Sequence, residues 1–335
     1  MLSVCIIGGS GIYGYVLNGL DQRTILRGVA AGSDGEDMTK IHTELARRGL
    51  DVPHFDDWQK MLDSIKPDIV AVHCHYAEHA RISLACLQRG IHVFSEKPIA
   101  ASFDELAALR AAYAAGSSKF CTNFSSRYKP WFRALEAALR ANRIGEVRLI
   151  QAQKSYLLGS RPDFYRSRAS YGGTIPWLGS HTMDWIPWLS RQRYESVFAT
   201  HSTQHNAGYG ELEATAQCQF ILSNGLSASV SIDFLHPQTV RIVYDDRIRV
   251  LGTHGSLETR DEEAWLLNAE SKERQRLPLH EEQSIFKDFV GDITGEGVCD
   301  VQASDAFVAT EACLKARQSA DEHRVIYFDE PPAKP

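Results

Sequence analysis

The chain has 335 residues with a formal net charge of −6, and 44% of its residues are hydrophobic. A mildly acidic chain lacks the positive surface that nucleic acid or an anionic membrane attracts, so neither partner is predicted. The length is typical of two globular domains.

The start of the chain and its cysteines indicate a compartment. The N-terminus begins with a strand pattern at Leu2–Ile7, so no signal peptide is expected. No apolar stretch is long enough to span a bilayer. The 7 cysteines are dispersed without a C-x-x-C pair, which is typical of reduced core thiols. We therefore expect a cytoplasmic protein.

A glycine-rich loop follows the first strand and precedes a helical pattern. Its glycines at 9, 11 and 14 fit G-x-G-x-x-G. Such a loop brings backbone N–H groups close to a pyrophosphate, which the helix N-terminus also attracts. The triplet alone is equally an ordinary strand–helix turn, but its flanking elements favour dinucleotide binding. The predicted cofactor-binding residues here are Gly9, Ser10, Gly11, Ile12, Tyr13 and Gly14.

The second predicted strand, 25–31, ends where an NAD-binding site usually carries an acid for the ribose 2′-OH. Gly32 or Ser33 occupies that position, and Asp34 comes one or two residues late. A small residue such as Ser33 leaves room for the 2′-phosphate of NADP, but no arginine follows at once to bind it. NAD and NADP therefore both stay candidate cofactors.

Strand and helix patterns alternate up to about Thr122, which predicts a doubly wound parallel sheet over residues 1–122. Ser102 and Glu105 form a capping box that opens one of the helices. The remaining elements predicted here are helices at 39–48, 55–62 and 103–115 and strands at 67–72, 91–94 and 120–122.

Polar clusters follow two of these strands, at His73–His79 and at Ser95–Lys97. Ligands of an open parallel sheet bind beyond the carboxyl ends of its strands, so Lys97 is placed to touch a bound molecule. The stretch from His75 to His79 is also a literal H-x-x-E-H, a pattern of zinc peptidases. Because His75 lies at a strand end rather than inside a helix, we favour a cofactor-contacting turn and predict no metal.

The pattern changes from about Asn123, and residues 123–335 are predicted as a second domain. Asn224-Gly225 between alternating runs at 216–222 and 226–232 is a strong hairpin signal, with one apolar face and one of Gln and Ser. Other expected elements are helices at 131–141, 285–293 and 304–320 and strands at 147–153, 247–251, 256–258 and 325–328.

The segment 157–171 carries Arg161, Tyr165 and Arg166 with little periodicity. It is either a substrate loop rich in donors for hydroxyl or carboxylate groups or a solvated charged loop, and both interpretations stay open. Beyond it, His181 and Asp184 share a helical face. His181 is a candidate acid or base, or a histidine of the core.

These motifs together resemble the Gfo/Idh/MocA family (glucose-fructose oxidoreductase / inositol dehydrogenase). The resemblance spans nearly the whole chain and is carried by the glycine loop, the turn ending in His79, Glu96-Lys97-Pro98 and Gly179-Ser180-His181…Asp184. It implies a Rossmann domain followed by an α+β domain with a large open mixed sheet. It also implies NAD or NADP, a sugar, cyclitol or related polyol as substrate, and a homodimer or homotetramer formed through the open sheet face.

The resemblance implies roles for single residues. Lys97 and His181 match catalytic residues, with His181 as the base and Lys97 stabilising charge on the substrate oxygen. Asp184 orients the imidazole or is a structural acid, and we favour the structural role. The further cofactor contacts are Ser33, Cys74, His75, His79, Glu96 and Lys97, which also contacts the nicotinamide ribose. The further substrate contacts are Tyr165, Arg166, Trp177 and Asp184.

One departure bears on the reaction. Trp177 stands where the polyol dehydrogenases of the family carry the aspartate of a lysine–aspartate–histidine relay. Ordinary inositol or glucose oxidation is therefore in question. The alternatives are an enzyme of the same fold that uses transient oxidation for elimination or glycoside cleavage, and a non-catalytic sensor of nucleotide or sugar.

Overall fold

The computed structural model describes residues 1–239 and 244–328, which form two compact units. Unit 1 comprises residues 1–125, 169–172 and 284–310, and unit 2 comprises the described parts of 126–168, 173–283 and 311–335. The domain boundary between residues 122 and 123 stays a prediction. Each unit is built around a sheet of its own.

Unit 1 contains the predicted doubly wound parallel sheet, in the order β3-β2-β1-β4-β5-β6. Strand β4 in the middle is buried throughout because helices lie on both faces of the sheet, which is why it reads as an unbroken apolar run. The strands are β1 Leu2–Ile7, β2 Thr24–Ala30, β3 His54–Phe55, β4 Ile69–Val72, β5 His92–Ser95 and β6 Phe120–Thr122.

The helices of unit 1 agree with the predicted alternation except at one start. The helix expected from residue 55 begins at Trp58, because Phe55 belongs to the short edge strand β3 and Asp57 caps the helix through the N–H groups of Gln59 and Lys60. The capping box of Ser102 and Glu105 is confirmed. The helices are α1 Gly14–Gly19, α2 Thr39–Arg47, α3 Trp58–Ile65, α4 His79–Gln88, α5 Phe103–Ala115 and α10 Ile285–Thr294.

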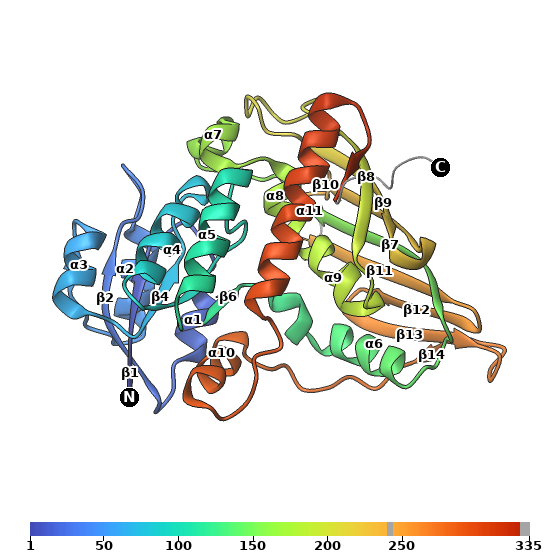
Figure 1. Ribbon diagram of the computed structural model, residues 1–335, viewed down its shortest axis with the longest axis horizontal. Coiled ribbons are helices and arrows are strands. Elements are labelled where there is room, and N and C mark those ends of the chain that lie inside the picture. Colours follow the sequence, from blue (N-terminus) through green and yellow to red (C-terminus); the bar gives the residue numbers. More distant parts are fainter. Residues whose placement is uncertain (240–243, 329–335) are drawn as a thin grey trace. The chain divides into compact units, whose positions relative to one another are not determined.

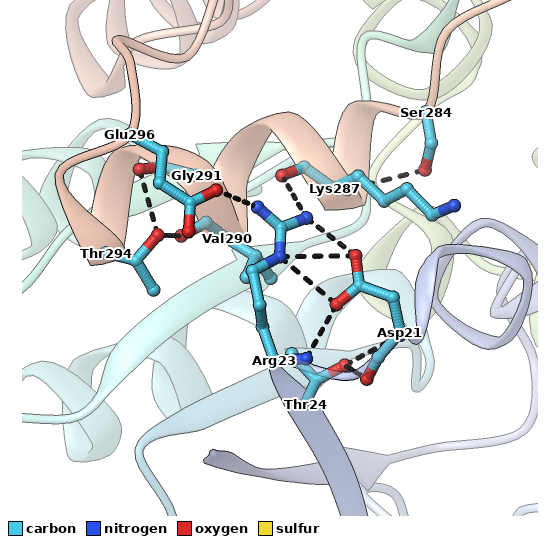
Figure 2. Close-up of polar contacts among 9 residues, drawn as sticks. All are labelled: Asp21, Arg23, Thr24, Ser284, Lys287, Val290, Gly291, Thr294 and Glu296. Carbon is cyan, nitrogen blue, oxygen red and sulfur yellow. Dashed lines mark hydrogen bonds and ion pairs between the residues drawn. The ribbon is translucent and has the colours of Figure 1, made fainter.

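Helix α10 brings a distant part of the sequence back to unit 1. Phe286 packs edge-on against Phe94 of β5, with ring centroids 5.4 Å apart. Arg23, just before β2, binds Asp21 and also Glu296 beyond the helix, with nitrogen–oxygen distances of 2.7 and 2.6 Å (Figure 2). One guanidinium thus ties the two ends of unit 1 together.

Unit 2 is built on nine strands that run side by side as one open mixed sheet (Figure 1). The predicted large open sheet is therefore confirmed. Its order is β14-β13-β12-β11-β7-β10-β9-β8-β15, and only the β10–β7 pair is parallel. The strands are β7 Val147–Tyr156, β8 Tyr194–Ser202, β9 Thr215–Leu222, β10 Ser227–Asp233, β11 Tyr244–Gly252, β12 Gly255–Arg260, β13 Glu263–Asn268, β14 Gln275–Arg276 and β15 Ile326–Tyr327.

The predicted hairpin is confirmed as β9–β10, with alternate residues buried as expected. Asn224 and Gly225 both have positive φ, the conformation that their dipeptide signal predicts. The strand expected at 147–153 extends to Tyr156, and β8, β13 and β14 were not predicted.

Short and long helices complete the chain. Those wholly in unit 2 are α6 Pro130–Arg140, α8 Thr174–Leu178 and α9 Ser180–Ser190, while α7 Arg168–Tyr171 and α11 Ala303–Glu322 each belong partly to both units. All seven cysteines are buried free thiols, as predicted. None of the described helices has the length and apolar character needed to cross a bilayer.

Candidate active site

The glycine loop of unit 1 lies at the carboxyl edge of the sheet, directly against the loop that follows β4. The N–H groups of Ser10 and Gly11 donate to the carbonyl of His73, at 3.0 and 2.7 Å. A Cβ on Gly11 would approach His73 Nδ1 and Glu96 Cγ to 2.9 Å. Glycine is therefore required at position 11 by the close packing of three strand ends.

The turn into α1 provides donors for an anion. Within the described chain, the N–H groups of Ile12 and Tyr13 donate to no other residue. Unpaired N–H groups at the start of a helix after a glycine loop bind the pyrophosphate of a dinucleotide. The residues present thus fit NAD or NADP at this loop.

Glu36 is a member of this site that the sequence reasoning missed. Its carboxylate is buried and joins the loops after β1 and β2. Oε1 accepts from the N–H groups of Gly9 and Ser10 at 2.9 and 3.0 Å and from the Ser10 hydroxyl at 2.6 Å. Oε2 accepts from the N–H groups of Gly32 and Ser33 at 2.9 and 3.2 Å.

Glu36 was not predicted because the turn that precedes it was not recognised. Glu36 lies beyond the expected position of the acid, but the chain reverses at Ser33–Glu36, where the Glu36 N–H donates to the Ser33 carbonyl at 3.2 Å. Gly35 has a φ of +67° in that turn. The reversal returns Glu36 to the strand end, whereas Asp34 is exposed. Ser-Asp-Gly in front of a glutamate is the signal that could have revealed it.

A buried polar group follows β4, β5 and β6. Asn123 donates to Glu96 Oε1 at 2.6 Å, and His73 Nδ1 lies 3.9 Å from the same oxygen. Both ring nitrogens of His73 are buried without a hydrogen-bond partner among the residues that the structure describes. Burial lowers the pKa of His73 to about 4, although the Glu96 charge acts in the opposite direction. His73 is therefore a neutral imidazole at physiological pH.

Lys97 follows Glu96 and is almost completely buried. Its position depends on His79, whose Nδ1 lies 2.8 Å from the Pro98 carbonyl and whose Nε2 lies 3.1 Å from the Cys74 carbonyl. His79 thus fastens the β4 turn to the segment that carries Lys97. The neighbouring His75 donates its N–H to the Ser33 hydroxyl at 3.1 Å, which joins the turns after β2 and β4.

The H-x-x-E-H stretch is divided between two elements. His75 precedes the short 3₁₀ turn Tyr76–Glu78, and His79 begins α4 with both ring nitrogens facing carbonyls. Within the described residues, no group of three His, Cys, Asp or Glu side chains is arranged to hold a metal ion.

In unit 2, His181 and Asp184 lie at the start of α9 and are both buried. The Asp184 carboxylate accepts two bonds from the Arg127 guanidinium, at 2.9 and 2.5 Å. This bidentate pair agrees with a structural role for Asp184, because one face of the pair lies against the Trp188 ring, 5.3 Å away.

Two other predicted substrate residues of unit 2, Tyr165 and Trp177, come together around Arg161. Their ring centroids are 5.3 Å apart in an edge-on arrangement, and Trp177 stacks on Phe234 at 5.7 Å. The Arg161 guanidinium lies over the rings of Tyr156, Tyr165, Trp177 and Phe234, at 5.7, 5.5, 5.5 and 5.4 Å. We call these five residues the Arg161 cluster.

Arg166, the fourth predicted substrate residue, lies outside the Arg161 cluster. Its side chain is 52% exposed and is paired with Asp163 at 2.8 Å. It also donates to the Gly208 carbonyl at 2.7 Å and lies over the Tyr209 ring. These contacts fasten the 163–166 turn to the loop before β9, so the structure does not place Arg166 with Tyr165 and Trp177.

Comparisons with known proteins agree with this geometry. Residues 3–124 match the model of an oxidoreductase family with an NAD-binding Rossmann fold. Residues 132–258 match the GFO/IDH/MocA C-terminal domain. The two matched segments contain the glycine loop with Lys97 and His181 with the Arg161 cluster, respectively.

Individual relatives cover most or part of the chain. A solved structure from Thermotoga maritima, provisionally named an oxidoreductase, is 41% identical with a TM-score of 0.96, and the match covers 98% of this chain and 100% of that one. Inositol 2-dehydrogenase of Ralstonia nicotianae is 25% identical over 86% of each chain. An uncharacterized oxidoreductase of Bacillus subtilis, YrbE, is 23% identical over 60% of this chain and 57% of its own length. The chain therefore belongs to the GFO/IDH/MocA family of oxidoreductases that bind NAD through a Rossmann fold.

Proposed function

We propose that this oxidoreductase transfers a hydride between NAD and a carbinol carbon of a sugar, cyclitol or related polyol. The observation that carries the proposal is the glycine loop, whose N–H donors lie at the sheet edge that also carries buried Lys97. The inositol 2-dehydrogenase relative supports the substrate class.

In this scheme the chain's own residues transfer the hydroxyl proton and stabilise the charge on the substrate oxygen. When bound, the nicotinamide accepts the hydride during oxidation and returns it during reduction. His181 takes the hydroxyl proton as general base, a contribution of typically about 100- to 10,000-fold. The Lys97 ammonium stabilises the negative charge that develops on the substrate oxygen. His79 acts through the backbone by holding the Lys97 segment.

Glu36 favours NAD over NADP in this proposal. Its buried carboxylate accepts hydrogen bonds at both loops beside the expected ribose position. A 2′-phosphate there would face a second anion, whereas the neutral ribose hydroxyls of NAD would not be repelled. The small Ser33 does not decide the preference, because the acid returns to the site two residues beyond Asp34.

A substrate screen tests the function. Purified protein is incubated with NAD or NADP and a panel of polyols and sugars, and absorbance of the reduced nicotinamide is followed. We expect persistent NADH formation with at least one member of the panel. Tight NAD binding without turnover of any member would contradict an oxidoreductase role and favour the sensor alternative.

One observation favours a second candidate reaction. Trp177, in the place of the relay aspartate, packs among aromatic rings and carries no acid. An enzyme that oxidises its substrate only transiently, for elimination or glycoside cleavage, releases no net NADH. Product analysis by mass spectrometry without nicotinamide absorbance would identify this reaction.

We also propose a cytoplasmic homodimer or homotetramer joined through the open sheet face. Phe198 and Ile221 on neighbouring strands of that face are 44% and 40% exposed. The seven free thiols suit a reducing compartment. Light scattering on the native chain and on an Ile221→Glu variant tests the assembly, and a wild-type monomer would contradict it.

A further inference from the structure

The guanidinium of the Arg161 cluster has no carboxylate partner among the described residues. No Asp or Glu oxygen in residues 1–239 and 244–328 lies within 4.0 Å of an Arg161 nitrogen. Nη2 donates to the Leu157 carbonyl at 2.7 Å. Nε is buried and has no hydrogen-bond partner among those residues. A guanidinium presents five N–H donors, so most of the Arg161 donors have no acceptor in the described chain.

The surrounding rings compensate only part of this cost. Four aromatic faces within 6 Å attract the cation, and such contacts contribute about 0.5 to 2 kcal/mol each. A buried donor without an acceptor costs about 1 to 3 kcal/mol. The arrangement therefore stabilises the cation but leaves its Nε–H without an acceptor in the described chain.

A second cation adjoins the cluster through the Tyr156 ring. Lys154, two residues earlier on β7, lies 5.6 Å from that ring and is buried. Its ammonium is paired with Asp246 at 2.5 Å. The two cations and one carboxylate leave one net positive charge beside an aromatic wall.

We propose that Arg161 binds the carboxylate of an acidic sugar, so that the substrates of this enzyme are uronates or aldonates rather than neutral polyols. The inference rests on the proposed dehydrogenase function and names its substrate class. A planar guanidinium fork matches a carboxylate in bidentate geometry. A carboxylate carries the single negative charge that the cluster lacks. A sugar phosphate brings closer to two charges at neutral pH, which exceeds what is left uncompensated.

The test compares sugars that differ only in the acid. The pairs are D-glucuronate with D-glucose and D-galacturonate with D-galactose, with D-glucose 6-phosphate as a third anion. The kcat and KM are measured with NAD, and binding is measured by calorimetry in the presence of NADH. We expect each uronate to have a kcat/KM about 10- to 100-fold above its neutral partner, the range of a charged hydrogen bond.

Variants assign the preference to Arg161. Arg161→Met should raise the KM of the uronates by about the same 10- to 100-fold factor and bring the uronate-to-neutral ratio of kcat/KM close to one. Arg161→Lys, which keeps the charge without the fork, should give an intermediate KM. The matched control is Arg148→Met, because Arg148 lies on β7 of the same unit with a 51% exposed side chain paired with Glu146.

The outcomes separate this inference from the function itself. Oxidation of neutral sugars as good as that of uronates, or a preference for the 6-phosphate, would overturn the acidic-sugar assignment while leaving the dehydrogenase function standing. If no sugar of either kind reduces NAD, the proposed function fails first. Should Arg161→Met not fold, the uronate-to-neutral ratio of the wild-type protein still decides.

Discussion

Two arginines of unit 2 lie against aromatic side chains, but only one of them is paired with a carboxylate of the described chain. Arg127 has a 3% exposed side chain, forks onto Asp184 and lies over the Trp188 ring. Arg161 lies over four rings and has no carboxylate partner in the described chain. The comparison teaches that a charge paired by the chain serves the fold, whereas one left with free donors is available to a ligand.

Unit 1 shows a satisfied charge of the opposite sign. The Glu36 carboxylate takes four backbone N–H groups and a hydroxyl, so it holds two loops in place while it also sets the electrostatic character of the cofactor site. A satisfied charge can therefore act on a ligand through its field without offering a free bond.

The largest expected effect concerns the paired arginine. Arg127→Met should lower the free energy of unfolding by about 3 to 5 kcal/mol, because it removes the guanidinium that forks onto the buried Asp184 carboxylate. Urea denaturation measures the change. The matched Arg161→Met variant should lose less, since it removes cation–ring contacts but strands no opposite charge. Equal losses in the two variants would break the comparison.

Lys97 is expected to affect kcat, whereas Arg161 is expected to affect the KM of acidic substrates. Lys97→Met should reduce kcat by about 100- to 1,000-fold, because the fixed cation acts on charge that develops only in the transition state. Arg161→Met should instead act mainly on the KM of acidic substrates. Steady-state kinetics separates the two, with the exposed Lys60→Met on α3 as control. Full turnover in Lys97→Met would remove Lys97 from the mechanism.

His73 predicts how stability depends on pH. Its folded pKa is about 4, lowered by burial, against about 6.5 in the unfolded chain. Between these values the unfolded chain binds a proton that the folded chain does not. The free energy of unfolding should therefore fall as the pH decreases from about 6.5 to about 4, by on the order of 3 kcal/mol. His73→Phe should flatten this slope in urea titrations, and an unchanged slope would refute the assignment.

The smallest expected effect tests Glu36. Glu36→Gln removes the negative charge but keeps an oxygen for some of the N–H donors, so the NAD-to-NADP ratio of kcat/KM should fall by about tenfold. Loss of activity with both cofactors alike would mean that Glu36 acts only on loop structure. Thermal unfolding of the variant checks that the loops stay folded.

Local patterns were sufficient for much of the architecture. The apolar run of β4, the Asn224-Gly225 hairpin and the Ser102–Glu105 capping box each depend on near neighbours, and all three are confirmed. The β8, β13 and β14 strands escaped prediction because strand pairing across the open sheet, rather than local periodicity, holds them in place.

The candidate site also has a part that the sequence predicted and a part that only the structure revealed. The sequence alone determined the glycine loop, the strand ends that carry Glu96 and Lys97, and the family to which they belong. Only the tertiary structure decided that Glu36 turns back onto the loop, that Asp184 pairs with Arg127, and that Arg161 is ringed by aromatic side chains without a described carboxylate beside it. The physical reason is that a charge is satisfied by whatever the fold brings near it, and some of those partners are distant in sequence: Gly9 is 27 positions from Glu36, and Asp184 is 57 positions from Arg127.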